Sequence, residues 1–374
     1  MKIVFIAVKG IPIGGGIEKY TEELGSRLVQ RGHQVIVYTS RHYKATDGDY
    51  KGMTLISLPS INSRSLQKLS LACLASIHQL SLRNVDIVHY HAIGPSVFCF
   101  ISRLIGRATV VQSHGHEWMR AKWGSIGKMF FKVTELAAVY FPHALTAVSC
   151  ELKKFYEEKY KSSVSYIPTG ITPVVKSKPD EILSLGLRGD DYILFAARLV
   201  EEKGAHYLID AYQALDTDIK LVIAGDAQHE DEYKSLLKDK CNNNPDIIMP
   251  GFVQGKILDE LFSNARIYVL PSEIEGLPIS LLEAMSYGNC CVVSDIPENK
   301  EALGDCGFIF KNKDANDLAL CLKRLLTNDD LLRSKNDLAV KRVEENYTWD
   351  YVTDQFESMY QQLKTSGVVC VEPE

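Results

Sequence analysis

Two carboxylates in the second half of the chain are spaced to bind a polyhydroxyl ligand. Glu275 and Glu283 lie in the run 271–285, which follows an apolar stretch. Gly276 permits a sharp loop, and Pro278 suits the first turn of a helix. On the loop, Glu275 can hydrogen-bond a sugar. On an apolar helix, Glu283 would be buried and would need a partner such as paired hydroxyls. The alternative is that Glu275 complements the helix dipole and Glu283 is solvated.

Two further segments have residue types that bind anions. Arg198 and Lys203 flank a short turn after an apolar run, and such a pair can clamp a diphosphate. Pairing with the two neighbouring glutamates is the alternative. Gly14, Gly15 and Gly16 stand between the first predicted strand and its helix, where backbone N–H groups can approach an anion. They do not form the dinucleotide fingerprint, and no acidic residue ends the next strand, so a nicotinamide cofactor is not expected.

Histidines close two more apolar runs. His89 and His91 end one run, while His114 and His116 follow another, with Glu117 next to them. Histidines at i, i+2 spacing together with a carboxylate can bind a metal ion. The alternative, which we favour, is that these side chains line a wet crevice.

A stretch of mixed aromatic and basic residues comes next. It runs from Trp118 to Lys132 and contains Arg120, Lys122 and Lys128. This mixture suits an anionic interface or a lipid phosphate. A core helix with a solvated basic face is the alternative.

The elements that position these residues form two series. Apolar strands are predicted at 2–8, 34–39, 54–58, 85–89, 108–112 and 145–148, and again at 192–196, 220–224, 247–249, 267–270 and 291–294. Helical periodicity separates most of them, which indicates parallel sheets covered on both faces. Most of the candidate segments above follow a predicted strand, the position where doubly wound sheets bind ligands.

A Pro- and Gly-rich stretch at 167–173 separates the two series. We therefore predict an α/β protein of two doubly wound, Rossmann-like domains with the ligand site in a cleft between them. The N-terminal domain spans 1–172 and is expected to bind the acceptor. The C-terminal domain spans 173–346, and a last helix and tail occupy 347–374.

Composition narrows the class of protein. The chain has 374 residues, enough for two domains of about 150 residues each. Its apolar content of 46%, charged content of 24% and net charge of −5 are those of a globular protein without a field that attracts nucleic acid. The nine cysteines form no C-x-x-C pair, and no signal peptide or membrane-spanning run is apparent. We expect a cytoplasmic protein with reduced thiols.

Together these segments resemble glycosyltransferase family 4, retaining nucleotide-sugar transferases with the GT-B fold. The E-x7-E pattern from Glu275 to Glu283 carries most of the resemblance, and GGGIEK, ARLVEEKG, IAGD and VSDIPENKE support it. The stretch HGHEWMRAKW resembles a subgroup that builds bacterial capsule, O-antigen and exopolysaccharide units. The resemblance runs over nearly the whole chain. It also implies that the last helix crosses back to the first domain.

The resemblance implies a role for each matching residue. Arg198 and Lys203 neutralise the donor diphosphate. Glu283 hydrogen-bonds the ribose, while Glu275 and His114 reach the donor sugar. The implied donor-binding set is Gly15, Gly16, Arg198, Lys203, Gly276, Leu277 and Glu283; the implied catalytic set is His114, Arg198, Lys203 and Glu275; the implied acceptor set is His116, Glu117, Trp118 and Arg120. The two cations and the glycine N–H groups stabilise the leaving diphosphate, so no metal or other cofactor is expected.

The expected function is that of a retaining hexosyltransferase. It uses a nucleotide-sugar donor, with UDP favoured and GDP or dTDP open, and a saccharide linked to undecaprenyl diphosphate as acceptor. The expected location is the inner face of the cell membrane, attached peripherally. Three alternatives stay open: a non-hydrolysing UDP-sugar 2-epimerase, a metal-dependent hydrolase that uses the paired histidines, and a two-lobed sugar-binding protein.

Overall fold

The chain folds into two compact units. A computed structural model describes residues 1–6, 8–12, 16–43, 48–63, 66–115, 125–226, 231–241 and 244–366. Unit 1 comprises Met1–Gly170 and the segment that begins at Trp349, and unit 2 comprises Ile171–Thr348. The predicted divisions after 172 and 346 lie within two residues of these bounds. None of the helices in the described ranges combines the length and the apolar character that a bilayer crossing requires.

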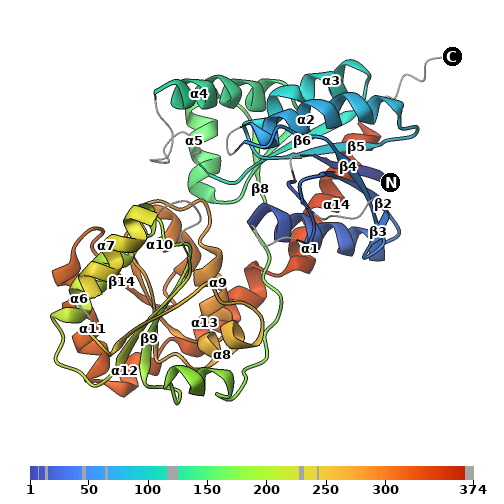
Figure 1. The fold of residues 1–374 in the computed structure, drawn as a ribbon. Coiled ribbons are helices and arrows are strands. Elements are labelled where there is room, and N and C mark those ends of the chain that lie inside the picture. The colour runs from blue at the N-terminus through green and yellow to red at the C-terminus, as the bar shows by residue number, and fades with distance from the viewer. Residues whose placement is uncertain are drawn as a thin grey trace. The chain divides into compact units, whose positions relative to one another are not determined.

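Unit 1 is built on an eight-stranded sheet in the order β3-β4-β2-β1-β5-β6-β7-β8 (Figure 1). The strands are β1 (Lys2–Ile6), β2 (Gln34–Ser40), β3 (Gly48–Tyr50), β4 (Met53–Leu58), β5 (Ile87–His91), β6 (Ala108–Ser113), β7 (Ala144–Ala147) and β8 (Val164–Tyr166). The helices are α1 (Gly16–Gln30), α2 (Gln67–His78), α3 (Cys99–Leu104), α4 (Ser125–Tyr140), α5 (Cys150–Tyr160) and α14 (Trp349–Thr365), with 3₁₀ turns η1 (Gln79–Ser81) and η2 (Pro95–Phe98). Buried apolar strands with helical crossovers account for the parallel pairing.

Unit 2 has a six-stranded, wholly parallel sheet in the order β11-β10-β9-β12-β13-β14. The strands are β9 (Tyr192–Ala196), β10 (Lys220–Ala224), β11 (Ile247–Gly251), β12 (Ile267–Leu270), β13 (Cys290–Ser294) and β14 (Phe308–Phe310). The helices are α6 (Ala205–Gln213), α7 (Asp231–Cys241), α8 (Lys256–Asn264), α9 (Ile279–Ser286), α10 (Pro297–Leu303), α11 (Ala315–Leu326), α12 (Asp329–Arg333) and α13 (Asn336–Asn346), with 3₁₀ turns η4 (Glu181–Leu185) and η5 (Glu201–Lys203).

The edge strand β3 departs from the predicted parallel pattern. It pairs antiparallel with β4 across Lys51 and Gly52, whose φ angles are 51° and 78°. Two central residues with positive φ are typical of a tight hairpin turn. The predicted strands do not include β3, β8 or β14, each of which is three residues long.

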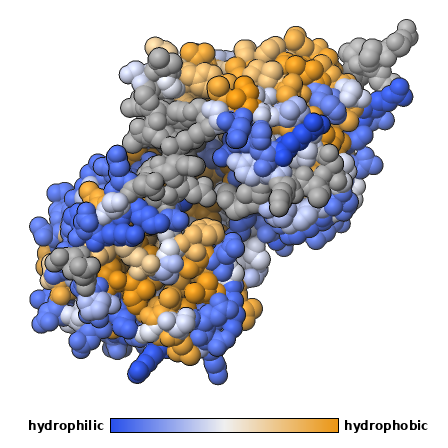
Figure 2. Space-filling view, in the orientation of Figure 1, coloured by the Kyte–Doolittle hydropathy of each residue, from blue (hydrophilic) through white to orange (hydrophobic). Residues whose placement is uncertain are grey.

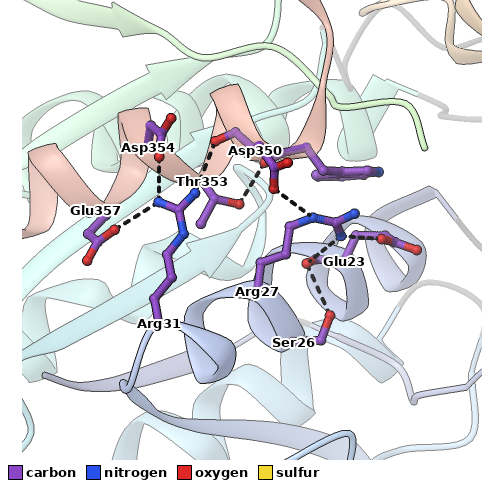
Figure 3. A network of polar contacts seen from close by, with 9 residues as sticks. Glu23, Ser26, Arg27, Arg31, Asp350, Thr353, Asp354 and Glu357 are labelled. Carbon is purple, nitrogen blue, oxygen red and sulfur yellow. Dashed lines mark hydrogen bonds and ion pairs between the residues drawn. The ribbon is translucent and has the colours of Figure 1, made fainter. Parts of the chain in front are cut away.

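Helix α14 returns to unit 1, as predicted, and lies beside α1 (Figure 1). Its apolar face joins the core of unit 1 through Trp349, Val352, Phe356 and Tyr360. Acidic side chains beside that face meet Arg27 of α1 and Arg31, which directly follows α1 (Figure 3). The Arg31 guanidinium lies 2.5 Å from the Asp354 carboxylate and 2.9 Å from that of Glu357. Helix α14 is therefore part of unit 1.

Candidate functional site

The loops that follow β9 and β12 leave the same edge of the unit 2 sheet. The two strands are parallel neighbours, so their carboxyl ends lie together. The Glu273 N–H donates to the Glu202 carbonyl over 2.9 Å and ties one loop to the other. Gly204 makes this approach possible: its φ is +69°, and a Cβ there would lie 2.1 Å from the Pro271 carbonyl oxygen.

This juxtaposition brings Lys203 and Glu275 into an ion pair although they are 72 residues apart in the sequence. Both side chains are largely buried, with 15% and 6% of their surface exposed. Ser272 Oγ donates a second hydrogen bond to the same carboxylate oxygen, Glu275 Oε1, over 2.7 Å. The predicted loop carboxylate and the predicted phosphate-binding lysine thus occupy one site.

Arg198 lies on the same loop as Lys203 but is exposed, and no described residue forms a hydrogen bond or ion pair with its guanidinium. Its backbone is fixed by the turn after β10, since the Leu199 N–H donates to the Asp226 carbonyl over 3.1 Å. Gly225 in that turn has a φ of +151°, and a Cβ there would lie 1.9 Å from the Ala197 carbonyl oxygen. The IAGD stretch therefore holds the base of the Arg198 loop.

The remaining donor residues of the second domain surround the start of α9. Leu277 is buried, and Pro278 is the N-terminal cap residue. The N–H groups of Gly276 and Leu277 donate to no described residue, so they are available to an anion. Glu283 is half-buried on α9, more exposed than predicted. Burial, reinforced by the carboxylates of Glu275 and Glu283 among its neighbours, raises the pKa of Tyr268 well above its usual value.

In unit 1, His114 directly follows β6, and its ring stands edge-on to Tyr20 with centroids 5.3 Å apart. It also lies 6.1 Å from the ring of His91. Gly16 is the first residue of α1, and a Cβ there would meet nothing within 4 Å, so the described structure leaves room at this position. The predicted residues Gly15, His116, Glu117, Trp118 and Arg120 lie outside the described residues.

His89 and His91 are fully buried and stack on each other, with ring centroids 4.3 Å apart. His89 Nδ1 meets the Tyr360 hydroxyl at 2.7 Å, and His91 Nδ1 meets Gln112 Oε1 at 3.1 Å. Burial lowers the pKa of His91 to about 3 and holds the pKa of His89 well below its usual range. Both rings are therefore neutral near pH 7.

The metal-binding interpretation of the paired histidines concerns His89, His91, His114, His116 and Glu117. Within the part of the chain that the structure describes, no three His, Cys, Asp or Glu side chains form a group that could hold a metal ion. Two of the residues that this interpretation used, His116 and Glu117, lie outside the described ranges.

Three buried residues that contribute to the site were not predicted: Ser272, Ser294 and Asn299. Ser294 Oγ donates to the Ser272 carbonyl over 2.5 Å, and Asn299 Nδ2 donates to Ser294 Oγ over 2.9 Å. The last two belong to the VSDIPENKE stretch, which supported the family resemblance without a role of its own. The sequence signal that could have indicated these residues is the presence of small polar residues close to the ends of apolar strands.

Two family models match the chain. Glycosyl transferases group 1 matches residues 178–342, and Glycosyltransferase Family 4 matches residues 14–174. The chain belongs to these glycosyltransferase families. The predicted family is thereby confirmed.

Similar proteins agree with this assignment. The chain is 27% identical to the UDP-Gal:alpha-D-GlcNAc-diphosphoundecaprenol alpha-1,3-galactosyltransferase of Escherichia coli, over 69% of this chain and 70% of the relative. Sucrose-phosphate synthase from Thermosynechococcus elongatus has a TM-score of 0.85 at 19% identity and covers 98% of this chain and 100% of its own. Anabaena HepE, solved in complex with UDP, has a TM-score of 0.80 at 18% identity over 97% and 100% of the two chains. These glycosyltransferase structures confirm the GT-B fold class.

Proposed function

We propose that this glycosyltransferase moves a hexose-type sugar from a UDP-sugar to a lipid-linked saccharide, with retention of configuration. The observation that carries the proposal is the set of Arg198, Lys203 and Glu275 at one edge of the unit 2 sheet. Two cations suit a diphosphate, and a fixed carboxylate suits sugar hydroxyls. The HepE complex with UDP and the E. coli relative that uses UDP-Gal favour uridine as the nucleoside of the donor.

In this proposal the protein acts mainly by stabilising the leaving group. Departure of the nucleoside diphosphate builds negative charge on its terminal phosphate. Arg198, Lys203 and the open N–H groups at the start of α9 meet that charge, so the reaction needs neither a metal ion nor another cofactor. The acceptor hydroxyl attacks from the side of the leaving group and gives its proton to the departing phosphate, which yields retention.

The remaining predicted residues keep their proposed roles. Glu275 positions the donor sugar and Glu283 holds the ribose, because carboxylates accept hydrogen bonds from paired hydroxyls. Unit 1 contributes Gly15, Gly16 and His114 to donor recognition. His116, Glu117, Trp118 and Arg120 contact the acceptor.

We further propose that unit 1 attaches to the inner face of the cell membrane, where a saccharide on undecaprenyl diphosphate would be available. Four apolar side chains form an exposed stripe at helical spacing along α4: Met129, Val133, Leu136 and Tyr140, with exposed fractions of 64%, 56%, 45% and 59%. Figure 2 shows hydrophobic surface gathered over the part of unit 1 that α2, α3 and α4 cover. Exposed Lys132 on α4 adds a positive charge that suits anionic lipid headgroups.

A vesicle assay tests this attachment. The chain is expected to float with vesicles of phosphatidylglycerol and phosphatidylethanolamine, and M129Q/V133Q/L136Q is expected to reduce the bound fraction at least about fivefold. L320Q is the matched control, because Leu320 is 67% exposed on α11 of unit 2. Equal binding by the wild type and the triple variant would exclude the α4 stripe.

A donor screen tests the reaction. The purified protein is incubated with UDP-, GDP- and dTDP-hexoses in EDTA, with and without a membrane lipid extract, and nucleoside diphosphate release is measured. Release that depends on the extract, from one UDP-sugar, is the expected result, and NMR of the product gives the anomeric configuration. Conversion of the donor to its 2-epimer without transfer would instead show an epimerase. Activity that appears only when EDTA is omitted would show a metal requirement.

A further inference from the structure

The Lys203 ammonium and the Glu275 carboxylate, which the proposed function assigns to two parts of the donor, are paired with each other in this structure. Oxygen Oε1 of Glu275 accepts from both Lys203 Nζ and Ser272 Oγ. No described residue donates to Oε2. The carboxylate therefore has one satisfied oxygen and one oxygen open to a ligand.

The carboxylate is held by buried groups, whereas the lysine is not. Ser272 is fully buried, and its carbonyl accepts from Ser294, which in turn accepts from Asn299 on α10. This chain of hydrogen bonds starts from a helix that is remote from the loop in sequence. Lys203 has a flexible four-carbon stem and donates to no other described side chain. When the ion pair opens, we therefore expect the Lys203 side chain to move while Ser272 keeps the Glu275 carboxylate in place.

We propose that a nucleoside diphosphate takes Lys203 from Glu275 as it binds, and that the pair closes again when the diphosphate leaves. This inference rests on the proposed function, since it requires Lys203 to bind the diphosphate. A largely buried carboxylate that loses its counter-ion needs new hydrogen-bond donors. The hydroxyls of a donor sugar can supply them at Oε2 and Oε1. A free nucleoside diphosphate has lost the donor sugar, so it brings none of these hydroxyls to Glu275.

The Lys203–Glu275 pair therefore favours binding of the nucleotide-sugar donor over binding of the nucleoside diphosphate product. The free nucleoside diphosphate also carries more negative charge than the donor, because its terminal phosphate has a second ionisation near pH 6. Glu275 repels that charge and competes for Lys203. Glu275 thus has a second role beyond contact with the sugar: it weakens the binding of the product and favours its release.

Calorimetric titration of the full chain with UDP tests this role. E275Q keeps the size of the side chain and removes its charge, and it is expected to bind UDP about tenfold more tightly than the wild type. K203Q is expected to bind UDP about tenfold or more weakly. In K203Q/E275Q the gain from E275Q is expected to shrink, because the part of the gain that acts through Lys203 is lost and only the relief of direct repulsion is left. In turnover assays the inhibition constant of UDP should fall in E275Q.

E273Q is the matched control. Glu273 is a carboxylate of the same loop, but it pairs with Lys313 at 2.6 Å and accepts from the Tyr207 hydroxyl at 2.8 Å. Its neutralisation frees Lys313 rather than Lys203, so the UDP affinity is expected to stay within about twofold. E275A serves as a second charge-removing variant should E275Q fold poorly, and it predicts the same direction.

The possible failures are distinguishable. If the wild type binds UDP and K203Q weakens that binding, but E275Q and E275A bind UDP no more tightly than the wild type, the competition is overturned and the donor site stands. If UDP, GDP, dTDP and ADP all fail to bind the wild type, the proposed donor site fails and this inference falls with it.

Discussion

At the scale of single residues, substitution of Arg198 is expected to weaken ligand binding without lowering the stability of the fold. Arg198 is exposed and has no partner among the described side chains, so R198Q is expected to change the free energy of unfolding by less than about 0.5 kcal/mol. Loss of a charge-assisted contact to a diphosphate should weaken UDP binding by about 10- to 100-fold. Urea unfolding measures the change in unfolding free energy, and calorimetric titration with UDP measures the change in affinity. R188Q, at another exposed arginine of unit 2, should leave both unchanged.

The stacked histidines predict a pH dependence of stability. The folded state lowers the pKa of His91 to about 3 and the pKa of His89 well below 6.5, so the unfolded chain binds more protons in acid. Stability contributed by the neutral rings is complete above pH 6.5 and is lost as the pH falls below it. Each ring adds a slope of about 1.4 kcal/mol per pH unit.

Tryptophan fluorescence during urea unfolding measures this slope, because Trp349 is buried in the core of unit 1 and the sequence of unit 2 contains no tryptophan. Between pH 6.5 and 5 the slope should flatten in H89Q/H91Q and persist in H42Q, whose histidine is exposed. A slope that is identical in the wild type and in H89Q/H91Q would contradict the assignment of neutral rings.

Residue types predicted the candidate site better than they predicted its contacts. Spacing alone placed Glu275, Arg198 and Lys203 on loops after strands, because loop position follows from strand order. It did not predict that Lys203 pairs with Glu275, since a contact over 72 residues depends on which strands are neighbours and on side-chain rotamers. It also placed Glu283 in the interior, although the side chain is half-buried at the helix surface.

At the scale of elements, burial rather than charge holds α14 on unit 1. Phe356 is fully buried, whereas the ion pairs of Arg31 have partners at the surface (Figure 3). F356A is expected to cost about 3–5 kcal/mol of unfolding free energy, and R31A about 0.5–1 kcal/mol. Denaturant titrations followed by tryptophan fluorescence compare them. Equal costs would show that the ion pairs act as strongly as the core.

Element prediction succeeded where strands are buried on both faces. The limits of β9, β10 and β12 match the predicted ones, because continuous apolar runs between turns leave little choice of boundary. The strands β3, β8 and β14 end their sheets and have three residues each, a length too short for a pattern of apolar residues to repeat. For β3, the residues Lys51 and Gly52 were the overlooked hairpin signal.

At the scale of the whole molecule, the two units differ in continuity along the chain. Unit 2 is one continuous stretch, 171–348, with its own apolar core. Unit 1 is interrupted, and its core is completed by side chains from Trp349 onward. The chain passes from unit 1 to unit 2 between Gly170 and Ile171, inside the Pro- and Gly-rich stretch 167–173. Periodicity in the last helix could not predict which domain it joins, although the family resemblance did.

This difference predicts how fragments behave. The fragment 171–348 is expected to unfold cooperatively by circular dichroism and to bind UDP, because Arg198, Lys203 and Glu275 all belong to it. Its UDP affinity is expected to be weaker than that of the full chain by no more than about tenfold, since only the contribution proposed for Gly15 and Gly16 is missing. The fragment 1–170 lacks four buried aromatic and aliphatic side chains of its core, Trp349, Val352, Phe356 and Tyr360, and is expected to lose cooperative unfolding. Joining 349–366 to residue 170 should restore it. A short Gly-Ser linker suffices, since a Cβ on Gly170 would lie 2.7 Å from the Trp349 Cα. Cooperative unfolding of 1–170 at the midpoint of the joined form would show that unit 1 does not need α14.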